Sequence, residues 1–252
     1  IFFVSVTGIA TPSIDARLVN RLGFRQDIKR IPIFGLGCVA GAAGLARMYD
    51  YLKAYPTHRA ILLSVELCSL TLQPQDLSIA NLIASGLFGD GASCVIGLGD
   101  AHQPASAATP RVIASESRFY PETEDVMGWE IGHKGFKVIL KASVPHLAET
   151  YVGNDVDSFL GKHGLTRTDI KHWVCHTGGP KVLLSFAKAL ELSKEQTKHS
   201  WESLHSVGNL SSSSVLYVLK ATLEKDRPQK GDYGVLLAMG PGFCCEMVLF
   251  QC

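Results

Sequence analysis

A single cysteine stands where a short apolar run passes through a glycine turn into a long helical pattern. The apolar run covers residues 31–34, the turn is Gly35-Leu36-Gly37, and the helical pattern covers residues 39–55, directly after Cys38. Apolar side chains recur at helical spacing in this pattern, at Leu45, Met48, Tyr49 and Leu52. The stretch predicts a strand–turn–helix unit, as found in layered α/β folds.

The same position favours a reactive thiol. Glycine and alanine surround Cys38, so no bulky side chain blocks an approaching substrate. The first amides of the following helix, and its dipole, favour negative charge on the sulfur. A helix N-terminus contributes only about 0.3–1 kcal/mol, which is less than one pKa unit at roughly 1.36 kcal/mol per unit. If Cys38 is a nucleophile, a base or cation from elsewhere in the chain must therefore assist it.

Two other interpretations of this stretch are open. A lone cysteine among small residues is often a buried filler. The spacing Gly35-x-Gly37-x-x-Ala40 also matches the dinucleotide-binding fingerprint, which requires an acidic residue about 20 positions further on. The next predicted strand, residues 60–65, reaches Glu66 well beyond that distance. Nucleotide binding is therefore disfavoured.

Composition places the chain among ordinary globular proteins. It has 252 residues, of which 46% are hydrophobic and 19% charged, and its formal net charge is +1. This charge disfavours nucleic acid or an anionic membrane as the main partner. Seven cysteines without regular spacing predict reduced thiols, and the adjacent Cys244 and Cys245 lack zinc-site spacing. We expect a cytoplasmic protein, because no run is long enough to span a membrane or typical of a signal peptide.

The rest of the chain alternates strand and helix patterns in two halves. In the first half, strands are expected at 1–6, 31–34, 60–65 and 92–98, and helices at 15–22, 39–55 and 77–87, the last capped by Asp76. In the second half, strands are expected at 112–115, 172–175, 233–239 and 245–250, and helices at 136–161, 181–190 and 211–224. Residues 99–110 are linker-like. Similar glycine turns precede strands in both halves, which suggests an internal duplication.

His176 and Asn209 are the polar residues best placed to assist Cys38. His176 ends an apolar strand and precedes a Gly-Gly-Pro turn, and Asn209 occupies a turn before a helix, where asparagine is also a common N-cap. Three polar residues at three such junctions can converge at one edge of a layered sheet. The other histidines in polar surroundings are expected at the surface: His58, His102, His163 and His199.

These residues belong to motifs that occur in the same order in the type III polyketide synthases, the chalcone-synthase-like family. The motifs are Gly37-Cys38-x-Ala40-Gly41, Leu87-Phe88-Gly89-Asp90-Gly91, His176-x-Gly178-Gly179-Pro180, Gly208-Asn209-x-Ser211-Ser212 and Gly240-Pro241-Gly242. The resemblance runs from about Val4 to Phe250. It implies an α/β fold of the thiolase type, a duplicated αβαβα layered structure that works as a homodimer. Residues 1–105 would form the half with the nucleophile, and residues 106–252 the half with the histidine and the asparagine.

The resemblance implies that Cys38, His176 and Asn209 form the catalytic centre of an acyltransferase. Cys38 would accept a starter from acyl-CoA, and His176 would pair with it as imidazolium. His176 and Asn209 would then polarise the thioester of malonyl-CoA while it loses carbon dioxide and extends the chain. The product would cyclise to a pyrone or a resorcinol. This chemistry implies no metal and no redox cofactor.

The resemblance also places residues around the substrates. Phe88 would stand between the CoA tunnel and the cavity, and Lys181 would contact CoA. The substrate cavity would be bordered by Cys68, Thr71, Trp129, Val138, Ser211, Gly240, Pro241 and Gly242. Most of these walls are compact and apolar, which favours a medium- or long-chain acyl starter at about 0.8 kcal/mol per buried methylene.

Departures from the family pattern narrow the subgroup. The usual Gly-Phe-Gly-Pro-Gly loop begins here with Ala238-Met239. Val6 stands where naphthalene-forming relatives carry a second pocket cysteine, and we expect bacterial alkylpyrone and alkylresorcinol synthases to be closest. The family's N-terminal region, with basic residues that hold CoA phosphates, precedes Ile1, so the sequence is interpreted as N-terminally truncated. Two alternatives remain open: a single-round ketoacyl synthase resembling the fatty-acid initiation enzyme, and an inactive relative.

Overall fold

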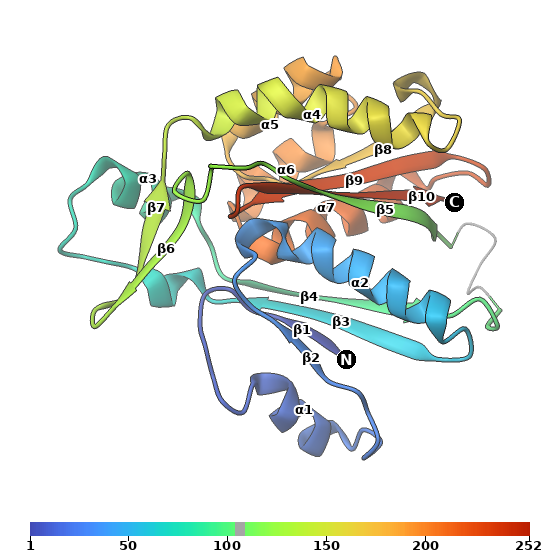
Figure 1. Cartoon of the computed structure of the whole chain (residues 1–252), viewed down its shortest axis with the longest axis horizontal. Helices are drawn as coiled ribbons and strands as arrows, with labels where there is room; N and C mark the ends of the chain where they lie inside the picture. The colour runs from blue at the N-terminus through green and yellow to red at the C-terminus, as the bar shows by residue number, and fades with distance from the viewer. Residues whose placement is uncertain (104–108) are drawn as a thin grey trace.

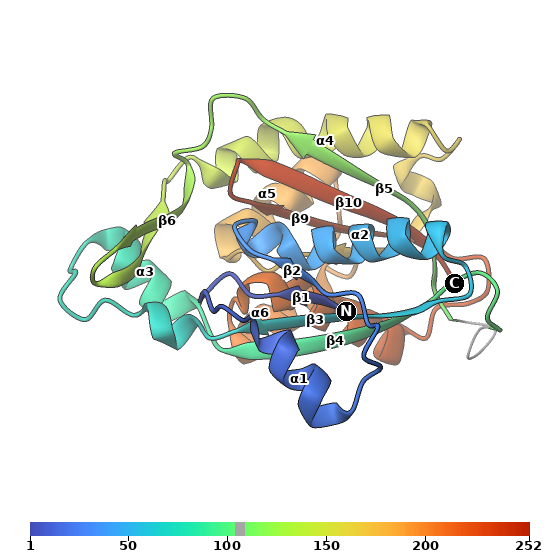
Figure 2. The ribbon, with the colours of Figure 1, turned by 60° about the horizontal axis from the view of Figure 1, so that its bottom comes forward.

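The computed structural model describes residues 1–103 and 109–252 and has five alternating layers (Figure 1). From one side to the other these are α4 with α5, the sheet β5-β10-β9-β8, α2 with α7, the sheet β2-β1-β3-β4, and α1 (Figures 1 and 2). The helices span Ile14–Leu22 (α1), Ala40–Ala54 (α2), Val144–Gly161 (α4), Pro180–Leu190 (α5) and Ser214–Ala221 (α7). This order confirms the thiolase-like αβαβα fold. The predicted boundary between residues 105 and 106 lies outside the described residues.

The two sheets repeat one pairing pattern. In the first, β1 runs parallel to β3, and β4 runs antiparallel to β3; in the second, β8 runs parallel to β9, and β10 runs antiparallel to β9. The strands are Phe2–Val4 (β1), Ile31–Ile33 (β2), Arg59–Glu66 (β3), Gly91–Leu98 (β4), Arg111–Phe119 (β5), Ile170–Cys175 (β8), Tyr233–Gly240 (β9) and Cys244–Gln251 (β10). The repeated pattern supports the internal duplication.

Burial follows from the layers. β9 and β10 are buried along almost their whole lengths, because helices cover both faces of their sheet. β3 alternates between buried and less buried residues, as expected for a strand with one fully covered face. One apolar core lies between the two sheets around α2 and α7, and a second lies between β8–β10 and the pair α4 and α5. Both cores reach the edge where β8 and β9 end.

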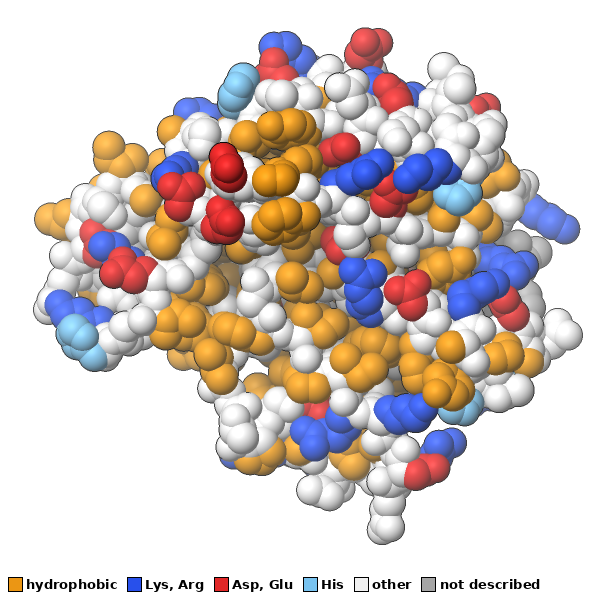
Figure 3. All heavy atoms as spheres, viewed as in Figure 1, with side chains coloured by type: hydrophobic (Ala, Val, Ile, Leu, Met, Phe, Trp, Pro, Cys, Tyr) orange, Lys and Arg blue, Asp and Glu red, His pale blue; other side chains and the backbone are white. Residues whose placement is uncertain are grey.

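The helix predicted over residues 136–161 is wrong at its beginning. A hairpin of β6 (Met127–Gly132) and β7 (Gly135–Leu140) precedes α4, which starts at Val144. Side chains alternate between exposed and half-buried along β7, which is the period of a strand. The hairpin and α3 (Ile79–Leu87) form a lobe beside the layers (Figure 1), and Figure 3 shows apolar side chains on it.

The capping prediction for α3 is also wrong. The N-cap is Ser78, whose hydroxyl accepts the N–H of Asn81, while the Asp76 carboxylate accepts the N–H of Ser78. Asp76 therefore orders the turn before the helix and does not cap it.

The sequence did not predict α6 (Lys198–Val207), which carries His199. His199 is buried, contrary to expectation, because its polar neighbours contact it: Nε2 lies 2.8 Å from Asp226 Oδ1 and Nδ1 lies 3.3 Å from Glu202 Oε2. Short helical turns complete the chain at Gly37–Val39 (η1), Cys68–Thr71 (η2), Arg167–Asp169 (η3), Ser211–Ser213 (η4) and Thr222–Asp226 (η5). Within the described ranges, no helix is both long and apolar enough to cross a membrane.

Candidate active site

Cys38 lies in the tight turn η1, immediately before α2, and only 6% of its surface is exposed. Gly37 has a φ of 55°, and a Cβ there would lie 2.4 Å from Cδ of Pro241. A Cβ on Gly240 would lie 2.7 Å from the backbone N of Val39. The turn between β9 and β10 therefore packs directly on the backbone around the cysteine, and the glycines make this approach possible.

His176 follows the last residue of β8 and is 2% exposed. Its backbone N–H donates to the carbonyl of Leu237 at 3.0 Å, which continues the pairing with β9. Gly179, with a φ of 135°, and Pro180 then turn the chain into α5. In the described part of the chain, neither ring nitrogen of His176 has a hydrogen-bond partner. Both ring nitrogens are therefore available to bond with a bound molecule.

Asn209 follows α6, is 1% exposed and is held by its backbone. Its N–H donates to the carbonyl of Leu87 at 2.8 Å, and its own carbonyl accepts the N–H of Gly89 at 3.0 Å. This pairing places Phe88 next to Asn209. Phe88 is half-buried and lines the same cavity, and its role as a gate stays a prediction.

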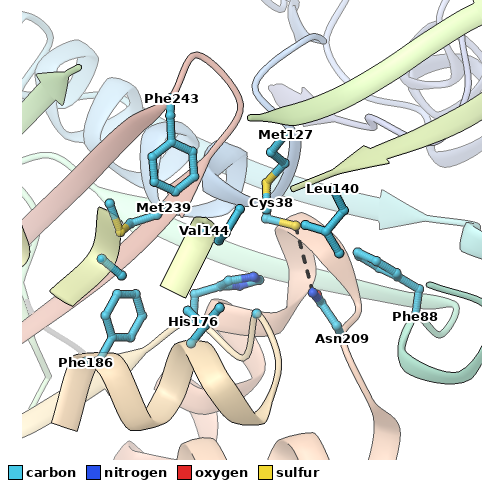
Figure 4. A pocket seen from close by; sticks show the side chains of 13 residues that line it. Cys38, Phe88, Met127, Leu140, Val144, His176, Phe186, Asn209, Met239 and Phe243 are labelled. Carbon is cyan, nitrogen blue, oxygen red and sulfur yellow. Dashed lines mark hydrogen bonds between the residues drawn. The ribbon is translucent and has the colours of Figure 1, made fainter. Parts of the chain in front are cut away.

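One cavity brings Cys38, His176 and Asn209 together (Figure 4). The Nδ2 atom of Asn209 lies 4.0 Å from Sγ of Cys38. The cavity has about 20 Å³ of space for the centres of water molecules, roughly enough for one. Its walls are almost entirely apolar, and sequence reasoning did not identify most of them: Met127, Leu140, Val144, Ala148, Val182, Phe186, Met239 and Phe243. They come from the hairpin, α4, α5 and the β9–β10 edge, which no local pattern connects.

Burial in apolar surroundings sets the protonation of the site. It raises the pKa of the Cys38 thiol to about 11, with the carboxylate of Glu66 adding to the effect, and it lowers the pKa of His176 to about 4. Both shifts favour the neutral forms of the two side chains. No hydrogen bond joins them within the described residues, and the thiolate–imidazolium pair that the resemblance implies stays a prediction.

A buried carboxylate lies behind the cysteine. The Glu66 side chain accepts hydrogen bonds from the N–H of Val6 at 3.1 Å and from the hydroxyl of Thr7 at 2.9 Å, and Ser212 donates to its other oxygen. Burial raises the pKa of Glu66. The sequence signal for this residue was available, because Glu66 is a charged residue at the end of the apolar run 60–65.

The eight pocket residues implied by the resemblance do not line this cavity within the described structure. Ser211 is nearest, with its hydroxyl 3.8 Å from Sγ of Cys38. Cys68 is buried, and the hydroxyl of Thr71 donates to its carbonyl at 2.8 Å. Trp129 donates to the carbonyl of Val6 at 2.9 Å and pairs with Val138 across the hairpin.

Lys181 is exposed in the first turn of α5. Its role toward CoA, and the roles of the eight implied pocket residues, stay predictions.

The fold is thiolase-like, and a cysteine, a histidine and an asparagine line one cavity in it. The chain belongs to the chalcone and stilbene synthase family: the family's N-terminal domain matches residues 1–101, and its C-terminal domain matches residues 111–252.

Relatives support this assignment. A 1,3,6,8-tetrahydroxynaphthalene synthase from Streptomyces peucetius subsp. caesius is 53% identical over 98% of this chain and 65% of its own length. A putative chalcone synthase from Bacillus subtilis (strain 168) is 43% identical over 100% of this chain and 70% of its own length. The crystal structure of the tetrahydroxynaphthalene synthase from Streptomyces coelicolor A3(2), a bacterial type III polyketide synthase, superposes with a TM-score of 0.93 at 32% identity, over 99% of this chain and 70% of that one.

The chain thus spans 65% of the length of the first of these relatives. Two of the three are named for naphthalene formation, so they do not support the expected alkylpyrone or alkylresorcinol subgroup, which stays a prediction.

Proposed function

We propose that the protein is a type III polyketide synthase, which loads an acyl-CoA starter on Cys38 and extends it with malonyl-CoA by decarboxylative condensation. The observation that carries this proposal is that one apolar cavity brings together a thiol, an amide donor and an imidazole without a partner among the described residues. The resemblance supports a homodimer and cyclisation to a pyrone or resorcinol as further parts of the proposal.

In the loading step, Sγ of Cys38 attacks the thioester carbonyl of acyl-CoA while His176 takes the thiol proton. The CoA thiolate leaves and receives that proton from the imidazolium, so the acyl group remains on Sγ and charge balances. With pKa values of about 11 for Cys38 and about 4 for His176, moving the proton from the thiol to the imidazole costs on the order of 10 kcal/mol when the two charges do not interact. Proton transfer must therefore accompany attack on a bound thioester, where the close ion pair and the developing bond offset this cost.

In the extension step, the thioester oxygen of malonyl-CoA accepts hydrogen bonds from Nδ2 of Asn209 and from an N–H of His176. Loss of carbon dioxide leaves an enolate, whose carbon attacks the acyl carbonyl on Cys38 and releases the Sγ thiolate. A preorganised donor to such an oxyanion is worth about 2.7–4 kcal/mol. A neutral imidazole keeps one N–H for this purpose, and the lowered pKa of His176 holds it neutral. This chemistry needs no metal or redox cofactor.

The walls favour an alkyl starter. Hydrocarbon side chains line much of the cavity: Val144, Ala148, Val182, Phe186 and Phe243. Each methylene of an acyl chain buried against them contributes about 0.8 kcal/mol. Because the cavity holds only about one water, its flexible wall residues must move when an acyl chain enters. Met127 and Met239 are suited to this, since methionine adapts to the space around it.

Mass spectrometry of products tests the proposal. The whole gene product is incubated with malonyl-CoA and with octanoyl-, palmitoyl- or coumaroyl-CoA, with Cys38→Ala as the control. A pyrone or resorcinol derived from an alkyl starter is expected. A single β-ketoacyl product would favour a single-round ketoacyl synthase, better turnover of coumaroyl-CoA would refute the starter preference, and no product would refute the proposed activity.

A further inference from the structure

Four consecutive buried serines follow the turn that carries Asn209. Ser211 contacts Sγ of Cys38, Ser212 donates to Glu66, Ser213 lies 2.7 Å from the hydroxyl of Ser64, and Ser214 contacts Asn209 itself. The last contact has a consequence for chemistry, because it determines which end of an amide faces the cavity.

The two ends of the Asn209 amide are not equivalent, since Oδ1 only accepts hydrogen bonds and Nδ2 only donates them. Two donors surround Oδ1: the N–H of Ser211 at 2.8 Å and the hydroxyl of Ser214 at 3.3 Å. Nδ2 consequently points to Sγ of Cys38 (Figure 4). A flipped amide would set its NH2 group against both donors and turn an acceptor toward the thioester oxygen.

The direction of the Ser214 hydroxyl is itself fixed. Its oxygen accepts the N–H of Leu210 at 2.7 Å, so its proton is directed away from that donor and toward Oδ1 of Asn209. Ser214 is completely buried, so water does not replace it. The bond from Ser211 alone would leave the amide free to turn about that single contact.

We propose that Ser214 is a positioning residue, which fixes the Asn209 amide so that Nδ2 is aimed at the thioester oxygen of malonyl-CoA. This inference rests on the proposed function. Ser214 touches neither the reacting sulfur nor the cavity, and it acts only through Asn209.

Ser214→Ala and Ser213→Ala make a matched pair for the test, because both residues are fully buried neighbours and only Ser214 contacts Asn209. In the whole gene product, Ser214→Ala should lower the rate of carbon dioxide release from labelled malonyl-CoA about three- to tenfold, the range expected for one lost neutral hydrogen bond. Acylation of Cys38 by acyl-CoA should not change. Ser213→Ala should retain the parental rate per folded molecule, with folding checked by thermal melting.

A double variant separates positioning from general damage. Once Asn209 is alanine, Ser214→Ala should cause no further loss of carbon dioxide release. An equal loss in Ser213→Ala, or a further loss in the Asn209→Ala background, would overturn the inference.

A second readout does not require polyketide activity. The pH profile of Cys38 alkylation, followed by peptide mass spectrometry, should move to higher pH in both Asn209→Ala and Ser214→Ala, because the Nδ2 contact lowers the pKa of the thiol. A parent without carbon dioxide release would refute the proposed function, whereas an unshifted profile in Ser214→Ala alone would refute the positioning role.

Discussion

Gly41 in α2 packs against the backbone of Ser212 in η4, and Gly41→Ala should drive these two elements apart. A Cβ on Gly41 would lie 2.0 Å from the backbone oxygen of Ser212 and 3.1 Å from Cγ1 of Val215. Ordinary contact begins near 3.4 Å, so α2 and η4 must separate by about 1.4 Å. Ser212 cannot yield easily, because its hydroxyl is bonded to Glu66 and lies 2.7 Å from that of Ser64.

Two opposing effects decide whether Gly41→Ala raises or lowers the free energy of unfolding. Alanine raises helix propensity over glycine by about 0.8–1 kcal/mol, whereas overpacking a core costs about 1–3 kcal/mol and sometimes more. Because the clash is with backbone, overpacking should win and lower the free energy of unfolding by about 1–2 kcal/mol. A misplacement near 1 Å can also reduce a rate about 10²-fold, so carbon dioxide release should fall strongly.

Gly86→Ala is the matched control, because Gly86 is a helical glycine in α3 with nothing within 4 Å of an added Cβ. It should leave stability unchanged or raise it by up to about 1 kcal/mol. Urea unfolding of the whole gene product and carbon dioxide release per folded molecule measure both effects. If Gly41→Ala matched Gly86→Ala in stability and rate, the close packing of α2 on η4 would be refuted.

Three further predictions concern the catalytic groups. Cys38→Ala should abolish labelling by acyl-CoA but retain some carbon dioxide release. Asn209→Ala should lower carbon dioxide release roughly 10²–10³-fold, while Cys38 is still acylated. The reverse pattern would contradict the assigned roles. Because burial raises the pKa of Cys38 to about 11, its alkylation rate should rise about tenfold per pH unit from pH 6 to pH 10, and a plateau by pH 8 would disprove this. Burial lowers the pKa of His176 to about 4 in the folded protein, against an ordinary 6.5. As the pH falls, the unfolded chain therefore binds this proton first, and the contribution of His176 to stability is lost between pH 6.5 and pH 4. Between pH 7 and pH 5 this loss is roughly 2 kcal/mol, and it should be absent in His176→Gln when urea unfolding is compared at the two pH values.

Sequence reasoning located the elements whose signals are local. The strand–turn–helix around Cys38, the strand before His176 and the turn at Asn209 all carry their own glycines and apolar periods, and each lies where predicted. The hairpin was missed because β7 ends at Leu140, only a few residues before α4 begins at Val144, so its apolar residues were read as the start of that helix. The alternation along β7 was present in the sequence, but it is too short to outweigh the longer helical period that follows.

The cavity walls could not be predicted, because they depend on packing between distant elements. Met127 comes from the hairpin, Val144 from α4, Phe186 from α5 and Phe243 from the turn before β10. The pKa shifts of the two groups could not be predicted for a related reason. Motif spacing brings Cys38 and His176 together, but it gives no measure of how completely apolar residues exclude water from both.

The duplication brings the N-termini of two central helices to the site. Cys38 precedes α2 and Asn209 precedes α7, so both central helices begin at the cavity, each after a short helical turn. Neither helix has a side-chain cap in the described structure, and the first N–H of each bonds to the turn before it: Ala40 to the carbonyl of Gly37, and Ser214 to that of Ser211. Two such termini together contribute about 0.6–2 kcal/mol to a thiolate or enolate. That is far below the cost of ionising the buried thiol, and the larger share must therefore come from His176 and Asn209, which the second half of the chain provides.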